Sequence, residues 1–79
     1  MNRSPHPVPT PRFERVCALA TEEATRRGHQ YVGVEHLMLA ILAEGSSVPA
    51  KALTRRATLD EFRSDLEEVM SAYARGGSP

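Results

Sequence analysis

The sequence predicts an all-α fold, a compact domain of four helices. Apolar residues recur at spacings of three and four along the chain, whereas no segment alternates apolar and polar residues over the length of a strand. Capping residues, glycines and prolines separate the apolar segments. The chain has 79 residues, enough for one small domain. We expect that domain at residues 10–75, with a flexible proline-rich arm at 1–9 and a flexible tail at 76–79.

The first helix is expected to begin at Thr10 and Pro11. Threonine is a favourable N-cap, and proline fits the first helical position, where the N–H has no partner in the helix. Arg26, Arg27 and Gly28 are suited to end the helix, because cations favour its negative end and glycine turns the chain. The apolar stripe of this helix consists of Phe13, Val16, Cys17, Ala20 and Ala24.

The second helix is expected from about Val34 to Glu44, with Gly45 as its stop. It is apolar in nearly every direction, which is typical of a helix buried on all sides, and so we expect it at the centre of the domain. A short third helix should follow Ser47, whose hydroxyl can cap it, with Pro49 in its first turn.

The fourth helix has the clearest start signal. Thr58-Leu59-Asp60-Glu61 is a capping box, with Thr at the cap and Glu three residues on. A long apolar stripe follows it and indicates one face packed on the rest of the domain. The stripe consists of Leu59, Phe62, Leu66, Val69, Met70 and Tyr73.

Composition excludes several classes of partner. Ten Lys and Arg balance ten Asp and Glu without a block of like charge, so the sequence shows no electrostatic footprint for nucleic acid or an anionic membrane. The longest apolar run, residues 37–43, is far too short to cross a bilayer. Cys17 is the single cysteine, which favours a reducing compartment, and the N-terminus lacks an apolar signal segment. We therefore expect a cytoplasmic protein, or a fragment of one.

The histidines raise the question of a metal or catalytic site. His29, Glu35 and His36 lie within GHQYVGVEHLMLAIL, but the spacing is not H-E-x-x-H, and no cysteine pair or third ligand is in register. We expect His29 to close the loop between two helices and His36 to pack or hydrogen-bond in a first helical turn. With no phosphate-binding loop either, the sequence predicts no metal, no cofactor and no enzyme. A metal-dependent hydrolase using these three residues is the alternative.

Glu35 and Thr10 form a more specific hypothesis. Each lies at the start of a helix, and Glu35 adjoins an exposed loop. Two helix N-termini lying side by side would form an anion site with a carboxylate next to it. Such a site suits a ligand that carries both a phosphate and a cation.

Residues 10–45, TPRFERVCALATEEATRRGHQYVGVEHLMLAILAEG, resemble the repeat that builds the N-terminal domain of Clp ATPases, especially of the ClpC type. That repeat reads roughly T-x-R-A-x-x-V-L-x-L-A-x-x-E-A-x-x-x-G-H-x-x-I-G-T-E-H-L-L-L-G-L-L-x-E-G, and the later helices match more loosely. The resemblance implies a four-helix Clp N-type repeat, half of the usual double-repeat domain. No Walker motif or AAA+ module accompanies it here.

The resemblance also implies a function and site residues. Such domains receive substrate and adaptor proteins for an AAA+ unfoldase, and ClpC-type repeats bind phosphoarginine. Carried onto this sequence, Glu35 would hold the guanidinium and Thr10 would help with the phosphate. Val34 stands where the family usually has threonine and Phe13 where it often has alanine, so both would reshape that ligand-binding surface.

Three modes of action are therefore expected of a single repeat. It would bind marked or adaptor-borne polypeptides at Thr10 and Glu35, as an accessory, adaptor or decoy for a Clp protease. Alternatively, it would form a homodimer, or dock on a Clp ATPase ring, through the face that a second repeat would cover. A third mode is capture of a cyclic peptide or another small apolar ligand, with Phe13 as the contact.

Overall fold

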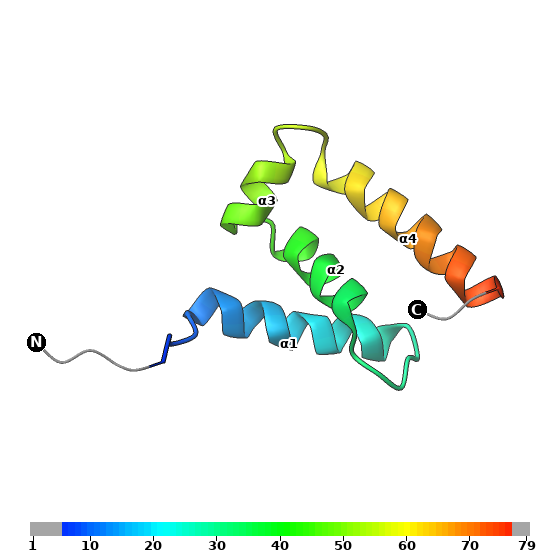
Figure 1. Cartoon of the computed structure of the whole chain (residues 1–79), viewed down its shortest axis with the longest axis horizontal. Helices are drawn as coiled ribbons and strands as arrows, with labels where there is room; N and C mark the ends of the chain where they lie inside the picture. Colours follow the sequence, from blue (N-terminus) through cyan, green and yellow to red (C-terminus); the bar gives the residue numbers. More distant parts are fainter. Residues whose placement is uncertain (1–5, 77–79) are drawn as a thin grey trace, which may run out of the picture.

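The computed structural model describes residues 6–76 and contains four α-helices and no strand in that part of the chain. Helix α1 spans Pro11–Arg26, α2 spans Val34–Glu44, α3 spans Val48–Leu53 and α4 spans Leu59–Gly76 (Figure 1). The expected all-α architecture of four helices is confirmed. The flexibility expected of residues 1–5 and 77–79 lies outside the described residues.

Side-chain caps define the starts of α1, α3 and α4, as the sequence predicts. The Thr10 hydroxyl accepts a hydrogen bond from the N–H of Phe13 at 3.1 Å, and the Ser47 hydroxyl caps α3. In the capping box of α4, the N–H of Glu61 donates to the Thr58 hydroxyl and the Glu61 carboxylate accepts from the N–H of Thr58. These bonds satisfy donors that have no partner within a helix.

Helices α1 and α2 form the packed centre of the molecule. The chain turns back after α1, so that α2 crosses it and ends near its beginning (Figure 1). An ion pair of 3.3 Å between Arg12 Nε and Glu44 Oε2 joins those two ends. Small residues at the crossing let the helices approach closely. The buried apolar residues are Val16, Ala20, Ala24, Leu39, Ala40, Leu42 and Ala50.

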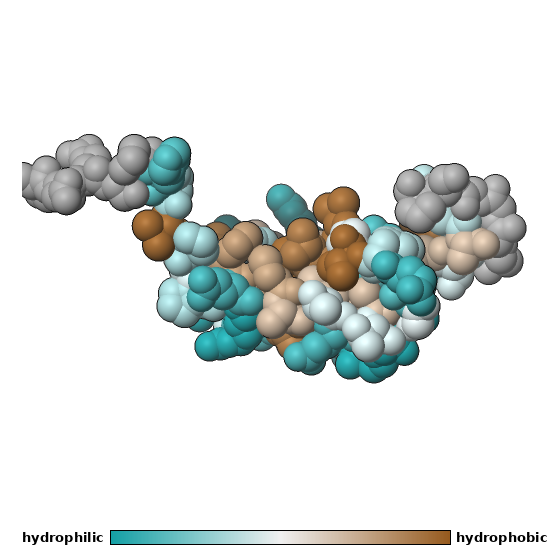
Figure 2. Space-filling model, turned by 90° about the horizontal axis from the view of Figure 1, so that it is seen from below, coloured by the Kyte–Doolittle hydropathy of each residue, from teal (hydrophilic) through white to brown (hydrophobic). Residues whose placement is uncertain are grey.

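Helix α2 is central, but the prediction that it is buried on all sides was too strong. Val34, Leu37 and Ile41 share one face of the helix by their spacing. Val34 is 78% exposed, Leu37 is 36% exposed and Ile41 is half-buried. The other three helices therefore do not cover this face of the central one. In Figure 2, apolar residues form a band between hydrophilic margins on the α1 side of the molecule.

Helix α4 is attached differently from the other helices. No side chain from Leu59 to Ala74 is buried, so the rest of the domain covers the apolar stripe of α4 only partly. Charged groups add a second attachment to α1: Arg27 pairs with both Glu23 and Glu67, and Arg63 lies 3.9 Å from Glu23. None of the described helices is long and apolar enough to cross a membrane.

Candidate functional site

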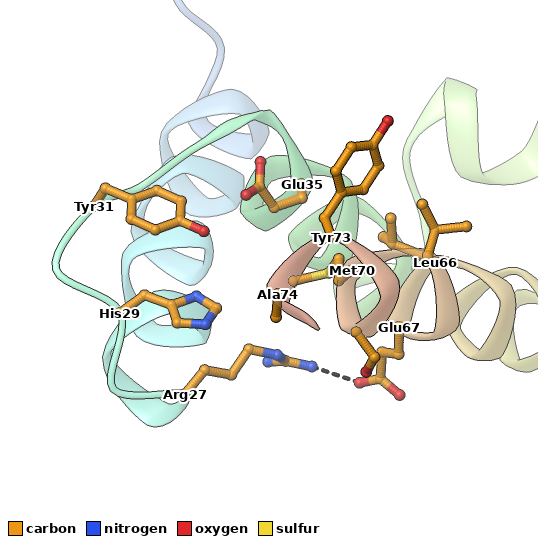
Figure 3. A pocket seen from close by; sticks show the side chains of 11 residues that line it. Arg27, His29, Tyr31, Glu35, Leu66, Glu67, Met70, Tyr73 and Ala74 are labelled. Carbon is orange, nitrogen blue, oxygen red and sulfur yellow. Dashed lines mark hydrogen bonds and ion pairs between the residues drawn. The ribbon is translucent and has the colours of Figure 1, made fainter. Parts of the chain in front are cut away.

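A pocket of about 640 Å³ lies between the 28–33 loop with the first turn of α2 on one side and the C-terminal half of α4 on the other (Figure 3). We call it the Glu35 pocket. His29 and Tyr31 point into it from the loop, Glu35 closes one end, and Arg27 lies at the other. Its complete lining is Arg27, His29, Tyr31, Glu35, Leu66, Glu67, Val69, Met70, Ser71, Tyr73 and Ala74.

The α4 side of the pocket is mainly apolar. Leu66, Met70 and Ala74 follow one another at intervals of four residues, which places them on one face of the helix. Leu66 and Met70 are half-buried, and the ring of Tyr73 is about half exposed beside them. This wall therefore offers aliphatic and aromatic surface to a side chain that enters the pocket.

The loop side is fixed by two histidines. Gly28 turns the chain with a φ of 73°, and the N–H of His29 then donates to the carbonyl of Ala24 at 2.9 Å. The rings meet with His29 Nδ1 2.8 Å from His36 Nε2, and Tyr31 stacks on His29 with ring centroids 5.3 Å apart. The expected structural roles, loop closure by His29 and a first-turn hydrogen bond by His36, are confirmed.

The histidines do not extend into a metal centre within the described residues. No group of three or more His, Cys, Asp or Glu side chains in residues 6–76 is arranged to hold a metal ion. His36 is fully buried, with one ring nitrogen bonded to Gly33 and the other to His29. Both nitrogens are therefore occupied by the protein itself.

Glu35 differs from the other partly or fully buried carboxylates in its lack of a cationic partner. Glu23, Glu44 and Glu67 each lie within 4.0 Å of an arginine nitrogen. Within the described residues, no arginine or lysine lies that close to half-buried Glu35. Its neighbour is the phenol of Tyr31, whose pKa is raised by burial and by its hydrogen bond to Glu35. The pocket thus ends in a negative charge that the protein does not neutralise.

Gly33 allows this position of Glu35. A Cβ atom at residue 33 would lie 2.6 Å from Glu35 Oε1, closer than carbon and oxygen can approach. The carboxylate therefore folds back over the backbone just before α2. Gly33 is also the N-cap of α2, and its N–H donates to His36 Nδ1 at 2.8 Å.

At the opposite end of the pocket, the charge of Arg27 is neutralised by ion pairs within the protein. The Arg27 guanidinium bonds to Glu23 through one nitrogen and to Glu67 through another. Burial alone would raise the pKa of Glu23, but hydrogen bonds from Arg26 and Arg27 hold it below its ordinary value. Arg27 is thus committed to structural ion pairs, unlike Glu35.

The structure does not bring Thr10 and Glu35 together within one chain. Glu35 shares a pocket with Arg27 at the end of α1, whereas Thr10 caps its start, about 25 Å away along the axis. The two helix starts lie far apart because α2 runs back across α1. Phe13, 56% exposed, is at the Thr10 end, and Val34 adjoins Glu35 but does not line the pocket.

Sequence reasoning missed most of the pocket. Leu66, Met70 and Tyr73 were visible as an apolar stripe, but that pattern indicates a packed face and does not distinguish a core from a pocket wall. Tyr31 had no signal beyond its position beside the histidines. Arg27 was interpreted as a helix-ending cation, and it is the C-cap residue of α1, but its ion pairs with Glu23 and Glu67 were not predicted.

Comparisons with known proteins point to one family. Residues 8–78 match the model of the Clp repeat (R) N-terminal domain. The chain is 34% identical over 70 residues to a Bacillus subtilis (strain 168) protein named negative regulator of genetic competence ClpC/MecB, an alignment that covers 87% of this chain and 9% of that protein.

Two further relatives support the same assignment. The ClpA homolog ATP-binding subunit of the ATP-dependent Clp protease from Porphyra purpurea is 36% identical over 66 residues, covering 82% of this chain and 8% of the relative. The chaperone protein ClpC1, chloroplastic, of Oryza sativa subsp. japonica is 52% identical over 44 residues, covering 56% of this chain and 5% of the relative. The chain thus spans less than a tenth of the length of these relatives.

Proposed function

Because the chain belongs to the Clp repeat N-terminal domain family and covers one repeat, we propose that it is a non-enzymatic protein-interaction domain. It binds substrate or adaptor polypeptides and acts as an accessory, adaptor or decoy for a Clp protease. Support comes from the Glu35 pocket, which combines apolar walls with a carboxylate suited to a cationic group. Nothing in this function requires a metal or a cofactor.

The unneutralised carboxylate of Glu35 is the observation that carries this proposal. A half-buried carboxylate without a cationic partner is favourable for an incoming guanidinium, which can make two parallel hydrogen bonds to it. The aliphatic stem of an arginine would lie along Leu66 and Met70, with its charged end at Glu35. Phosphoarginine carries the same guanidinium side and is the marked form that we propose for this site.

Calorimetric titration of the whole chain with phosphoarginine and with an arginine-containing peptide tests the proposal. We expect heat of binding with at least one of them, and a loss of about tenfold or more in affinity in Glu35→Gln. Glu68→Gln is the matched control, because Glu68 is an exposed carboxylate on α4 that does not line the pocket. No binding of either ligand, or equal affinity in the Glu35 variant, would overturn the proposal.

Self-association is a second candidate, and the incomplete cover of the helices favours it. The stripe of α4 is nowhere buried, and Leu37 on α2 remains partly exposed. A second copy across a twofold axis would cover such faces symmetrically. Analytical ultracentrifugation over micromolar concentrations should show a dimer that Leu37→Asp weakens. A strict monomer would exclude it.

A further inference from the structure

The hydrogen bonds around His36 determine which nitrogens carry protons. The N–H of Gly33 donates to His36 Nδ1 at 2.8 Å, so Nδ1 must be unprotonated. The proton of neutral His36 is then on Nε2, which faces His29 Nδ1 at 2.8 Å. His29 Nδ1 must therefore accept, and the proton of His29 is on its own Nε2. We call this chain of Gly33 N–H, His36 and His29 the histidine relay.

The histidine relay has no place for an additional proton. A proton on His29 Nδ1 would set two N–H groups against each other at 2.8 Å. If His36 changed tautomer to receive that bond, its Nδ1 would carry a proton toward the N–H of Gly33. Any single protonation therefore breaks one of the two hydrogen bonds, and the broken bond involves a fully buried ring.

Glu35 shares the pocket with His29, but it makes no ion pair with either imidazole. Within the described residues, no carboxylate lies within 4.0 Å of either imidazole. The charged and titratable groups that share the pocket with His29 are Arg27 of α1, Tyr31 of the loop, Glu35 of α2 and Glu67 of α4. Arg27 and Glu67 are paired with each other, and Arg27 would repel a second cation. A charged ring inside the closed relay would therefore have no hydrogen-bond acceptor for its additional proton.

The histidine relay is also the main attachment of the pocket wall. Between the N–H of His29 and the N-cap at Gly33, the described loop makes no backbone–backbone hydrogen bond. Tyr31 is held by stacking on His29 and by its edge contact with His36, with ring centroids 5.3 and 5.2 Å apart, and its phenol hydrogen-bonds to Glu35. Opening the relay therefore removes the histidine support of Tyr31 and of the turn before Glu35, and leaves the Tyr31–Glu35 pair without a fixed place at the pocket (Figure 3).

We propose that His29 and His36 are positioning residues that make the Glu35 pocket sensitive to protons. Acidification opens the histidine relay and disorders the 28–33 loop, while the α1–α2 pair remains folded. The loss of ligand binding on acidification rests on the proposed function, but the opening of the loop does not. The two are measured separately.

Nuclear magnetic resonance of the ¹⁵N-labelled whole chain tests the relay without any ligand. In the closed relay the proton of each neutral ring should be on Nε2. Between about pH 7.5 and 5.5, the range in which histidine side chains commonly take up protons, the hydrogen-exchange protection of the Gly33 N–H should fall about tenfold. The N–H groups of Leu39 and Ala40 should keep theirs. A proton on His36 Nδ1 at the higher pH, or unchanged protection of Gly33, would overturn the proposal.

The double variant His29→Gln/His36→Gln separates proton sensitivity from structural support. Glutamine at the third helical position is the usual capping-box partner of the N-cap N–H and does not take up a proton in this range. The variant should keep Gly33 protection constant over the same pH range, whereas the control His6→Gln should behave as the wild type. Equal pH dependence in the double variant contradicts the proposal. If it does not fold, the ring protonation and Gly33 protection of the wild type decide.

Binding is measured last, with phosphoarginine or the arginine peptide at both pH values. Wild type should lose about tenfold in affinity at the lower pH and the double variant should not, as expected for one lost hydrogen bond at a buried group. If neither ligand binds at any pH, the proposed function fails, and the ligand-free measurements alone decide whether acidification opens the relay. If binding falls equally in both proteins, the positioning role is excluded.

Discussion

The α1–α2 pair and the Glu35 pocket are neighbours that are built in opposite ways. Leu39 and Ala40 of α2 have no exposed surface, whereas the pocket wall on α4 has no buried side chain from Leu59 to Ala74. The pair is held by apolar packing. The α4 wall is held by a half-buried stripe and a few ion pairs, and the loop wall by the histidine relay. A chain of this size buries one interface completely and leaves the second one adaptable.

The same contrast appears between two carboxylates. Glu23 is buried on α1 and bonds to Arg26 and Arg27, whereas Glu35 has no cationic partner among the described residues. A buried charge that is fully paired contributes to the fold, and an unpaired one at a pocket edge is available to a ligand. We therefore expect substitutions in the α1–α2 pair to cause large losses of stability, and substitutions in the Glu35 pocket to cause small ones.

Leu39→Ala should have the largest effect on stability. Leu39 is fully buried at the centre of α2, and removing such a side chain lowers the free energy of unfolding by about 2–5 kcal/mol through lost burial and a remaining cavity. Leu66→Ala, at a half-buried position of α4, should lose less than half as much. Urea unfolding followed by circular dichroism measures both. Equal losses would show that the two regions do not differ in the way their burial indicates.

Glu23→Gln should rank second. It removes the charge that Arg26 and Arg27 contact, and we expect a loss of about 1–3 kcal/mol near pH 7. Because the pKa of Glu23 is held below its ordinary 4.5, its stabilisation is fully present above that pH and is lost as the pH falls below it.

The pH dependence gives this prediction its control. The urea midpoint of Glu23→Gln should lie below that of the wild type at about pH 7. This difference should shrink at about pH 3.5, as the native carboxylate takes up its proton. Glu22→Gln, at an exposed neighbouring position, should track the wild type at both. A Glu23 variant whose deficit persists unchanged at the lower pH would argue for altered packing instead of lost charge.

The sequence predicted the first of the two regions far better than the second. Caps at Thr10, Ser47 and Thr58 and stops at Gly28 and Gly45 are local features, and all of them appear in the structure where the pattern indicates. Local signals suffice for helix ends because the partners lie within four residues.

The pocket depends on how helices meet, which spacing does not encode. Glu35 was identified correctly as a residue beside an exposed loop, but its proposed neighbour Thr10 lies at the other end of α1. The stripe containing Leu66 and Met70 is a pocket wall because no other helix among the described residues covers it fully. The two histidines were expected to have structural roles. Their hydrogen bond to each other was not predicted, because it depends on the loop folding back onto α2.

Gly45→Ala should have a moderate effect. Gly45 ends α2 in the left-handed region with a φ of 75°, and its N–H donates to the carbonyl of Ile41. A side chain there introduces backbone strain of about 1–2 kcal/mol, although a Cβ atom would find ordinary contact distances. Thermal unfolding should show the lower stability, and Gly45→Asn, which tolerates this conformation better, should recover part of it. No difference between the two variants would contradict strain as the cause.

Gly33→Ala should have the smallest effect on stability and a large one on binding. Its φ of −113° suits any residue, and alanine loses less chain entropy on folding, which offsets its poorer N-cap preference to within about 0.5 kcal/mol. The new Cβ would meet the Glu35 carboxylate, the mobile end of a side chain, at 2.6 Å, so that carboxylate has to leave its place beside Tyr31. Urea unfolding should therefore be nearly unchanged, while affinity for the arginine peptide falls toward that of Glu35→Gln. If Gly33→Ala instead unfolds the domain, the pocket and the packed pair are one cooperative unit; if it binds as the wild type does, the folded-back position of Glu35 is not the one that meets the ligand.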